Sequence, residues 1–449
     1  MRRKNFARIV CIGVAAAMLA GCTGGGPGDK EQPEKTDRDS LTFVSEDYKP
    51  GNATVMKTEQ GYYYYSDSEK GFRYYDPATG KDMFLCNKPE CRHDGNEFCA
   101  ATNDKYGIDC VGMYGGRIFA TAIVATDTQF EFQLISVALD GSALNEEVTY
   151  LTLENTGPLP AYQIDKKQIY IHRNVAMIPM WMVGDIGTDV RTLFGTAVVN
   201  LDTKEVTYLD EEPLSGDNVE ITDITAYGDY IYYCKKEGKK TVLHRYNITN
   251  GTDETHKLLV GFKGNYVVQD DNTVVYTKSD NRTLCVYHRE TGENEEKLPL
   301  KRLKRVCNTE CTVTWEMEGA YEALELKTDG DYIYVKEPSA RNPLFNDTFN
   351  LDEGWDESYI HVFDKELTEV ATVNMAEAMA FAKEAGLEKE EDVDFHRMRH
   401  LYFDDDTVYV VSPKAGDYSK SCVYECPKEE FLTGEPQFEY IFTMMTQYR

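Results

Sequence analysis

The sequence has few basic residues for its length and lacks the short motifs of common enzyme classes. Its 449 residues include 48 Lys and Arg against 77 Asp and Glu, which gives a formal net charge of −29 at pH 7. Such a charge opposes binding to nucleic acid, which is itself a polyanion. No P-loop, dinucleotide fingerprint, Gly-x-Ser-x-Gly or His-Glu-x-x-His motif occurs. These absences exclude a nucleic-acid partner and leave no recognisable catalytic constellation.

The one long apolar run lies at the N-terminus. Residues Ile9 to Leu19 follow a basic start and lead into Leu19-Ala20-Gly21-Cys22, the arrangement of a secretory signal with small residues at its cleavage site. These eleven residues are too few for a membrane-spanning helix, which needs about 20. A cysteine directly after the small residues resembles the lipobox of bacterial lipoproteins. The resemblance implies cleavage before Cys22, lipidation of its thiol and anchoring to the cell membrane on the extracytoplasmic side.

Three regions follow from this interpretation. Residues 1–21 are the lipoprotein signal peptide. Residues 22–40 contain Gly, Pro and charge but almost nothing apolar. Such a segment cannot offset the entropy cost of its own ordering, so we expect a flexible tether. Residues 41–449 are expected to form the folded domain.

The folded domain repeats one pattern seven times. A short strand ends in a Gly/Asp turn, a Tyr-rich second strand follows, and a third strand ends in Asp or Asn before a Thr-Gly-like turn and a short fourth strand. The second strands are predicted to begin near seven positions: Tyr62, Arg117, Gln168, Tyr230, Thr273, Tyr332 and Thr407. The shortest spacing, 43 residues, matches the roughly 40 to 50 residues of a four-stranded propeller blade.

This repeat favours an all-β fold, a seven-bladed β-propeller of four-stranded antiparallel blades. A closed ring gives each small sheet two neighbours and leaves only short edges. A β-sandwich also has many strands separated by turns, but nothing in it requires one order of strands and turns to recur seven times. One short inserted helix is expected near residues 374–387, with Asn374 as its N-cap and Gly386 at its end.

With these features the chain resembles a group of largely uncharacterised surface lipoproteins of anaerobic, Gram-positive bacteria. The specific shared features are the lipobox and a segment with a Cys-x4-Cys-x-His pattern, Leu85-Cys86-Asn87-Lys88-Pro89-Glu90-Cys91-Arg92-His93-Asp94. Through the repeats, the resemblance covers almost the whole chain. It implies the fold and the location, and it implies almost nothing about activity.

Ten cysteines remain besides Cys11 and Cys22, and an even number in an exported chain suggests disulfides. We predict a disulfide arrangement, and no cofactor, for a group of cysteines with a nearby histidine: Cys86, Cys91, His93, Cys99 and Cys110. The alternative is structural zinc at Cys86, Cys91, His93 and Cys99, because Cys3His sets hold zinc. Cys307 and Cys311 are a second candidate disulfide. Cys422 and Cys426 would lie about 13 Å apart on one strand, which is too far to bridge.

Connection lengths predict which face of the ring is used for binding. Hairpin geometry places the first and third turns of every blade on one face, and the other connections on the opposite face. The long segments belong to the second face, and two of them are predicted to be loops with apolar side chains. These loops span residues 173–191, with Met180 and Trp181, and residues 337–357, with Phe345 and Trp355. Long loops on a rigid scaffold often carry binding function; the alternative is that they only plug the ring.

The sequence therefore predicts a membrane-anchored lipoprotein, held by its N-terminal lipid, that is not an enzyme. Its loop face is expected to bind an unknown protein, peptide or glycan, with Met180, Trp181, Phe345 and Trp355 as contact residues. The alternative is a propeller hydrolase or lyase acting on a cell-surface or dietary polymer. Such an enzyme would need acids or histidines around the central channel, and the expected first strands show no convergent set of them.

Overall fold

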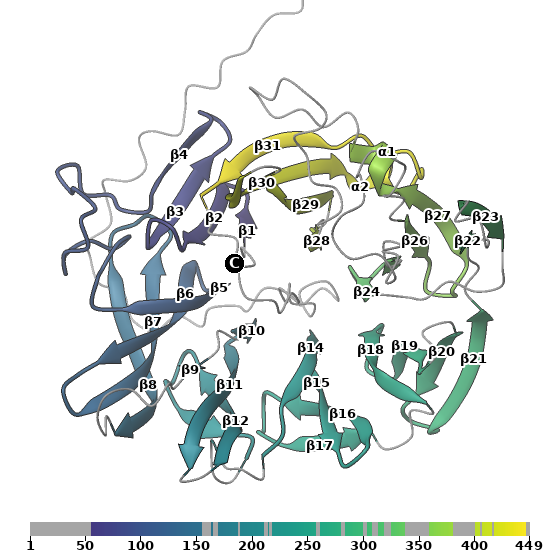
Figure 1. The fold of residues 1–449 in the computed structure, drawn as a ribbon, viewed down its shortest axis with the longest axis horizontal. Helices are drawn as coiled ribbons and strands as arrows, with labels where there is room; N and C mark the ends of the chain where they lie inside the picture. Colours follow the sequence, from purple (N-terminus) through teal and green to yellow (C-terminus); the bar gives the residue numbers. More distant parts are fainter. Residues whose placement is uncertain are drawn as a thin grey trace, which may run out of the picture. The chain divides into compact units, whose positions relative to one another are not determined.

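Seven antiparallel sheets are arranged in a ring in the described part of the chain (Figure 1). The structure is a computed structural model. It describes residues 55–154, 163–164, 169–186, 189–210, 214, 218–256, 261–279, 283–299, 303–307, 313–317, 325–336, 359–379, 400–404, 406–414 and 417–445. The ring belongs to one unit of the chain, residues 37–449. Each blade is built from four strands that follow one another in sequence, so the predicted seven-bladed β-propeller is confirmed.

The first four blades lie between Val55 and His256. Blade one is β1 (Val55–Thr58), β2 (Gly61–Ser66), β3 (Gly71–Asp76) and β4 (Lys81–Phe84). Blade two is β5 (Gly107–Tyr114), β6 (Arg117–Ala125), β7 (Gln129–Ala138) and β8 (Leu144–Glu154). Blade three is β10 (Tyr170–His172), β11 (Val175–Ile186), β12 (Asp189–Asn200) and β13 (Val206–Tyr208), with the short β9 (Gln163–Ile164) paired to β11. Blade four is β14 (Ile221–Tyr227), β15 (Tyr230–Glu237), β16 (Lys240–Asn247) and β17 (Asp253–His256).

The last three blades complete the ring. Blade five is β18 (Phe262–Val268), β19 (Thr273–Lys278), β20 (Thr283–His288) and β21 (Glu293–Pro299). A separate hairpin, β22 (Leu303–Cys307) and β23 (Val313–Met317), follows it. Blade six is β24 (Glu325–Thr328), β25 (Ile333–Lys336), β26 (Tyr359–Phe363) and β27 (Glu369–Asn374). Blade seven is β28 (His400–Phe403), β29 (Thr407–Lys414), β30 (Asp417–Pro427) and β31 (Glu439–Met444). The first strand of each blade lies nearest the centre of the ring (Figure 1).

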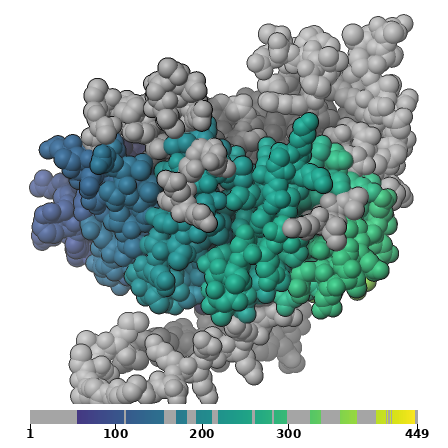
Figure 2. All heavy atoms as spheres, turned by 90° about the horizontal axis from the view of Figure 1, so that it is seen from below, coloured from purple at the N-terminus to yellow at the C-terminus, as the bar shows by residue number. Residues whose placement is uncertain are grey.

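The hydrophobic core consists of seven clusters, and each joins two neighbouring blades. Second strands such as β2, with four consecutive tyrosines, are buried along most of their length because a neighbouring sheet covers each face. In the side view, consecutive blades pack against one another without a break (Figure 2). Packing between blades therefore holds the fold together, as the two apolar faces of each repeat predict.

Polar contacts between blades reinforce the face that carries the short turns. Arg173, in the first turn of blade three, pairs with Asp229 in the corresponding turn of blade four. The buried Lys428 of blade seven pairs in the same way with Asp329 of blade six. Lys57 of blade one lies 3.0 Å from Asp404 of blade seven. Ion pairs on this face therefore link neighbouring blades of the ring.

The predicted strand order is correct for six blades and wrong for blade three. The segment near Gln168 leads into β10, which is the first strand of that blade and not its second. The expected loop over residues 173–191 is a long hairpin of β11 and β12, paired from Val175↔Asn200 to Ile186↔Asp189. The cause is a tight turn without glycine, in which Arg173 has φ +52°, so the sequence shows no Gly/Asp signal there.

The expected helix begins where the sequence places it. Helix α1 spans Met375–Met379, and the Asn374 side chain accepts a hydrogen bond from the Glu377 amide at 3.5 Å, as an N-cap does. Residues 380–387 lie outside the described part of the chain. A second short helix, α2 (Lys428–Phe431), lies between β30 and β31 and was not predicted. Among the described residues, neither helix has the length or apolar character needed to cross a bilayer.

Candidate metal centre

The Cys/His segment lies in the connection from β4 to β5, between blades one and two, which runs outside the sheets (Figure 1). Both of its ends are fixed to one residue of β3. The Leu85 amide donates to the Phe72 carbonyl at 2.9 Å, and the Phe72 amide donates to the Ala101 carbonyl at 2.9 Å. Ala100 and Ala101 are buried. These two hydrogen bonds and the buried alanines hold the connection against blade one. The cysteines between them therefore have defined positions.

Four potential ligands converge within this segment. The sulfur atoms of Cys86, Cys91 and Cys99 and one ring nitrogen of His93 all lie within 4.8 Å of one another. His93 Nδ1 lies 3.4 Å from Cys99 Sγ. Cys99 is buried, and the other three residues are half-buried. The convergence matches the Cys3His set recognised in the sequence.

Local turns produce this convergence. The Cys91 amide donates to the Lys88 carbonyl at 3.1 Å, and the Cys99 amide donates to the Asn96 carbonyl at 3.1 Å. His93 has φ +53°, in the left-handed region, which costs a residue with a side chain on the order of 1 kcal/mol. This left-handed conformation turns the chain so that the His93 ring faces the sulfur atoms. Strain of this kind is concentrated at functional positions.

Residues outside the sequence motif complete the site. Thr102 donates two hydrogen bonds to Cys99 Sγ, one from its amide and one from its hydroxyl, both at 3.3 Å. The Phe84 ring packs against the His93 ring, with centroids 4.8 Å apart. The turn between β7 and β8 also reaches the site, because the Asn87 amide donates to the Gly141 carbonyl at 3.2 Å. These three contact residues were not predicted, since spacing along the chain gives no sign of them.

The thiols differ in acidity. Burial raises the pKa of Cys99, but hydrogen bonds from the Thr102 side chain, His93 and the Thr102 amide outweigh it, and the pKa falls to about 6. A hydrogen bond from the His93 backbone lowers the pKa of Cys91. Burial and the neighbouring Cys99 and Cys86 thiols outweigh that bond, so the net shift is upward. Of these two thiols, Cys99 is therefore the more acidic.

The predicted disulfides are not present among the described cysteines. None of the seven cysteines whose side chains are described forms a disulfide: Cys86, Cys91, Cys99, Cys234, Cys285, Cys422 and Cys426. The preference for a disulfide at Cys86, Cys91 and Cys99 is therefore wrong for this structure, in which three thiols and an imidazole share one centre. Cys110 lies in β5, but its side chain is outside the described set, as are Cys311 and the side chain of Cys307.

The expectation that Cys422 and Cys426 do not bridge is confirmed. Cys422 and Cys426 lie on the same strand, β30, and do not pair with each other. Cys285 and Cys422 are buried, with 1% and 2% of their surface exposed. Both occupy third strands of their blades, β20 and β30. They act as small apolar side chains within the core.

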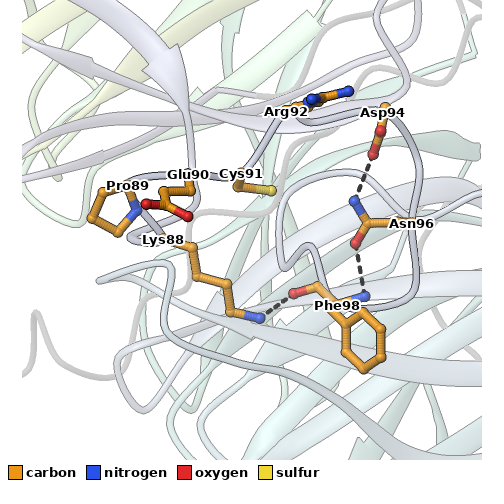
Figure 3. Close-up of a pocket in the computed structure, with 8 residues that line it drawn as sticks. All are labelled: Lys88, Pro89, Glu90, Cys91, Arg92, Asp94, Asn96 and Phe98. Atoms are coloured by element: carbon orange, nitrogen blue, oxygen red, sulfur yellow. Dashed lines mark hydrogen bonds between the residues drawn. The ribbon is translucent and has the colours of Figure 1, made fainter.

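A pocket of about 690 Å³ lies next to the cluster (Figure 3). Eight residues of the connection line it: Lys88, Pro89, Glu90, Cys91, Arg92, Asp94, Asn96 and Phe98. The Lys88 ammonium donates to the Phe98 carbonyl, and the Asn96 amide donates to the Asp94 carboxylate at 2.5 Å. The Phe98 side chain is 70% exposed. Polar contacts thus hold the pocket wall in place while one aromatic ring faces solvent.

The predicted partner-binding residues are not brought together in the described part of the chain. Met180 lies in β11 and is buried in the core between blades two and three. It is unsuited to contact a partner, and its assignment to an exposed loop was wrong. Trp181, beside it in the same strand, is half-buried and stays a prediction. Phe345 and Trp355 lie outside the described residues, and so does the predicted lipidation site, Cys22.

Comparison with known proteins gives no family for this chain. No protein-family model and no curated protein matches the chain. Among solved structures, the GH74 enzyme of Niastella koreensis is 10% identical, with a TM-score of 0.43 over 89% of this chain and 55% of that chain. An oligogalacturonate lyase of Vibrio parahaemolyticus is 10% identical, with a TM-score of 0.34 over 62% and 71% of the two chains.

A third solved structure is an uncharacterized protein from Listeria monocytogenes. It is 8% identical, with a TM-score of 0.39 over 76% of this chain and 84% of that chain. The structural neighbours thus include enzymes, but at this identity and TM-score they carry no argument about the activity of this chain. Function has to be argued from its own residues.

Proposed function

We propose that this protein is a lipid-anchored extracytoplasmic propeller that binds a protein, peptide or glycan and is not an enzyme. One observation carries the binding part of the proposal: the connection between blades one and two forms a pocket beside the exposed ring of Phe98. Fixed connections on a rigid scaffold are typical positions for binding residues. Lys88, Glu90 and Arg92 supply charges of both signs at the same pocket.

The location rests on the sequence of the N-terminus. A lipid on Cys22, followed by the polar segment up to residue 40, would hold the propeller near the outer surface of the membrane. The formal net charge of −29 opposes adsorption of the propeller to anionic lipid. The tether and the negative charge both fit a domain that is held at the membrane while its surface stays free for a soluble or cell-wall ligand. Trp181 is a further candidate contact residue, as are Phe345 and Trp355.

Labelling tests the location. The full chain and a Cys22→Ala variant are expressed in a Gram-positive host fed an alkyne fatty acid, and the cells are fractionated. We expect labelled protein in the membrane fraction for the wild type and an unprocessed, unlabelled precursor for the variant. Equal labelling and processing of the two chains would show that Cys22 is not the lipidation site.

Ligand arrays test the binding. The labelled full chain is applied to arrays of cell-wall glycans and peptides, together with Phe98→Ala and the control Val370→Ala, which shortens an apolar side chain 44% exposed in β27. We expect Phe98→Ala to weaken binding about tenfold, or ~1.4 kcal/mol, and the control to bind normally. Unchanged binding by Phe98→Ala would place the ligand elsewhere. Cleavage of an array glycan by the wild type would contradict the claim that the protein is not an enzyme.

A further inference from the structure

We propose that Cys86, Cys91, His93 and Cys99 hold one zinc ion in a closed tetrahedral site of three thiolates and one imidazole. The proposal is independent of the ligand-binding function, because it concerns the connection that carries the pocket and not what the pocket binds.

The distances suit a metal centre better than a disulfide. Zinc binds sulfur at about 2.3 Å and imidazole nitrogen at about 2.0–2.1 Å, so neighbouring ligand atoms of a tetrahedral site lie about 3.5 to 3.8 Å apart. The 3.4 Å between His93 Nδ1 and Cys99 Sγ already matches such an edge. The widest separation, at most 4.8 Å, needs a contraction of about 1 Å. A disulfide would join two sulfur atoms at about 2.05 Å and leave the third thiol beside the imidazole.

The donor set favours zinc over other cations. Three sulfur atoms and one imidazole are soft to borderline ligands, which select zinc over magnesium or calcium. Four protein ligands fill a tetrahedral coordination shell, as in structural zinc sites, and leave no open position for a reacting water. With zinc bound, three thiolates and a neutral imidazole leave about one negative charge. Lys88 and Arg92, in the same segment, can offset that charge.

The surroundings are those of a metal-bound thiolate. Thr102 directs an amide and a hydroxyl at Cys99 Sγ, and two donors on one sulfur are best satisfied when the sulfur is an anion. Partners of this kind orient the ligands of metal sites and adjust their basicity. Phe84 covers one face of the His93 ring, which restricts the ring to the orientation that faces the sulfur atoms. A bond to zinc would also offset the backbone strain at His93.

The consequence is structural. Cys86 lies two residues after β4, and Cys99 lies eight residues before β5. An ion bound to both closes the connection between the first two blades at its two ends. It would thereby fix the wall of the neighbouring pocket, of which Cys91 is a part.

The test measures zinc in the full chain, purified in detergent under reducing conditions. We expect one zinc per chain by elemental analysis, and an X-ray absorption spectrum with three sulfur neighbours and one nitrogen. Cys91→Ser and Cys99→Ser should retain less than a tenth of the zinc. The control Cys285→Ala removes a buried thiol from blade five and should retain all of it.

A second measurement guards against variants that do not fold. Wild-type chain is stripped of metal with a chelator and titrated with cobalt(II), and we expect the strong visible absorption of tetrahedral cobalt bound to thiolates. The proposal is overturned if the wild type carries no zinc and gives no such absorption, or if mass spectrometry finds a disulfide between any two of the three cysteines. Zinc retained in full by both serine variants overturns it as well.

Discussion

At the scale of single residues, buried histidines link the stability of the ring to pH. His172, at the end of β10, is 1% exposed, and its Nε2 lies 2.7 Å from the Gly228 carbonyl of blade four. Burial disfavours the imidazolium and lowers the pKa of His172 to about 4. Burial also lowers the pKa of His256 to about 4; its ring contacts Tyr232 of blade four and Tyr287 of blade five. Each imidazole is therefore held neutral inside a seam between blades.

The sign of the resulting pH dependence follows from the direction of these shifts. An unfolded histidine binds its proton near pH 6.5, whereas the folded ones do so near pH 4. Their contribution to stability is therefore complete above about pH 6.5 and is lost as the pH falls toward 4. A difference of about 2.5 pKa units corresponds to roughly 3 kcal/mol for each residue.

We expect His172→Gln, which keeps a side-chain donor toward Gly228, to reduce the fall in stability between pH 6.5 and 4 by about 3 kcal/mol. The free energy of unfolding in urea, measured across this range, gives the slope. His288→Gln changes a half-buried histidine of β20 and serves as the control. If His172→Gln keeps the full slope of the wild type, His172 is not the group that titrates.

At the scale of elements, the turn between β7 and β8 packs against the candidate metal centre. Gly141, in that turn, has φ +68°, and a Cβ added there would lie 2.7 Å from the Cys86 backbone nitrogen. Gly238, in the hairpin of β15 and β16, has nearly the same backbone, φ +65°, but nothing lies within 4 Å of such a Cβ. Alanine at Gly238 would therefore cost only the free energy of the left-handed backbone. Alanine at Gly141 would add the free energy of the clash.

We expect Gly238→Ala to lower the free energy of unfolding by about 1 kcal/mol, the strain of a left-handed alanine. Gly141→Ala should cost about 1 to 3 kcal/mol more, because its new methyl group collides with backbone that cannot easily move. It should also increase the rate at which a thiol reagent modifies Cys86. Urea unfolding and mass spectrometry of the modified cysteines measure both effects. Equal losses of stability in the two variants would contradict the packing of this turn on Cys86.

At this scale, a strand could be predicted from the sequence where glycine or aspartate marks the turn before it. In blade four, Gly228 and Asp229 form a two-residue turn with Gly228 at φ +59°, and β15 begins at Tyr230 as predicted. In blade three, Arg173 takes the left-handed conformation without a glycine to mark it, and β10 is only three residues long. The apolar residues after Arg173 were therefore assigned to a long loop inserted between two strands. An irregular turn shifted the assignment by one strand and placed Met180 in a loop.

Only some residues of the candidate metal centre could likewise be predicted from the sequence. The residues that converge were recognisable from their types and spacing in one segment. Thr102, Phe84 and Gly141 were not, because their contacts depend on how the segment folds back on blade one and on where the next blade lies. Whether the thiols pair or share a centre depends on distances of a few ångströms, which spacing along the chain does not determine.

At the scale of the whole ring, the described strands close it through contacts between blades one and seven and not through a shared strand. Blade one consists of the first four strands and blade seven of the last four, so no strand is exchanged between the two ends of the described chain. The Phe442 ring of β31 stacks on the Tyr75 ring of β3, with centroids 4.1 Å apart and planes 5° apart. Tyr62 donates a hydrogen bond to Glu425, and Tyr75 donates one to the Ile441 carbonyl at 3.0 Å. Aromatic packing and these hydrogen bonds replace the strand pairing that would otherwise hold the seam.

We therefore expect Phe442→Ala to weaken the seam between blades one and seven more than any other part of the ring. The ring of Phe442 is buried, with 3% of its surface exposed, so its loss should lower the free energy of unfolding by about 3 to 5 kcal/mol. Phe98→Ala makes the same change at a position that is 70% exposed and should have almost no effect on stability.

In the Phe442→Ala variant, hydrogen exchange should rise in β1, β2, β30 and β31 before it rises in blades three to five, because the Phe442 ring packs within the seam. A uniform increase of exchange around the ring would mean that the seam is no weaker than the other interfaces between blades, and that closure is shared equally by all seven.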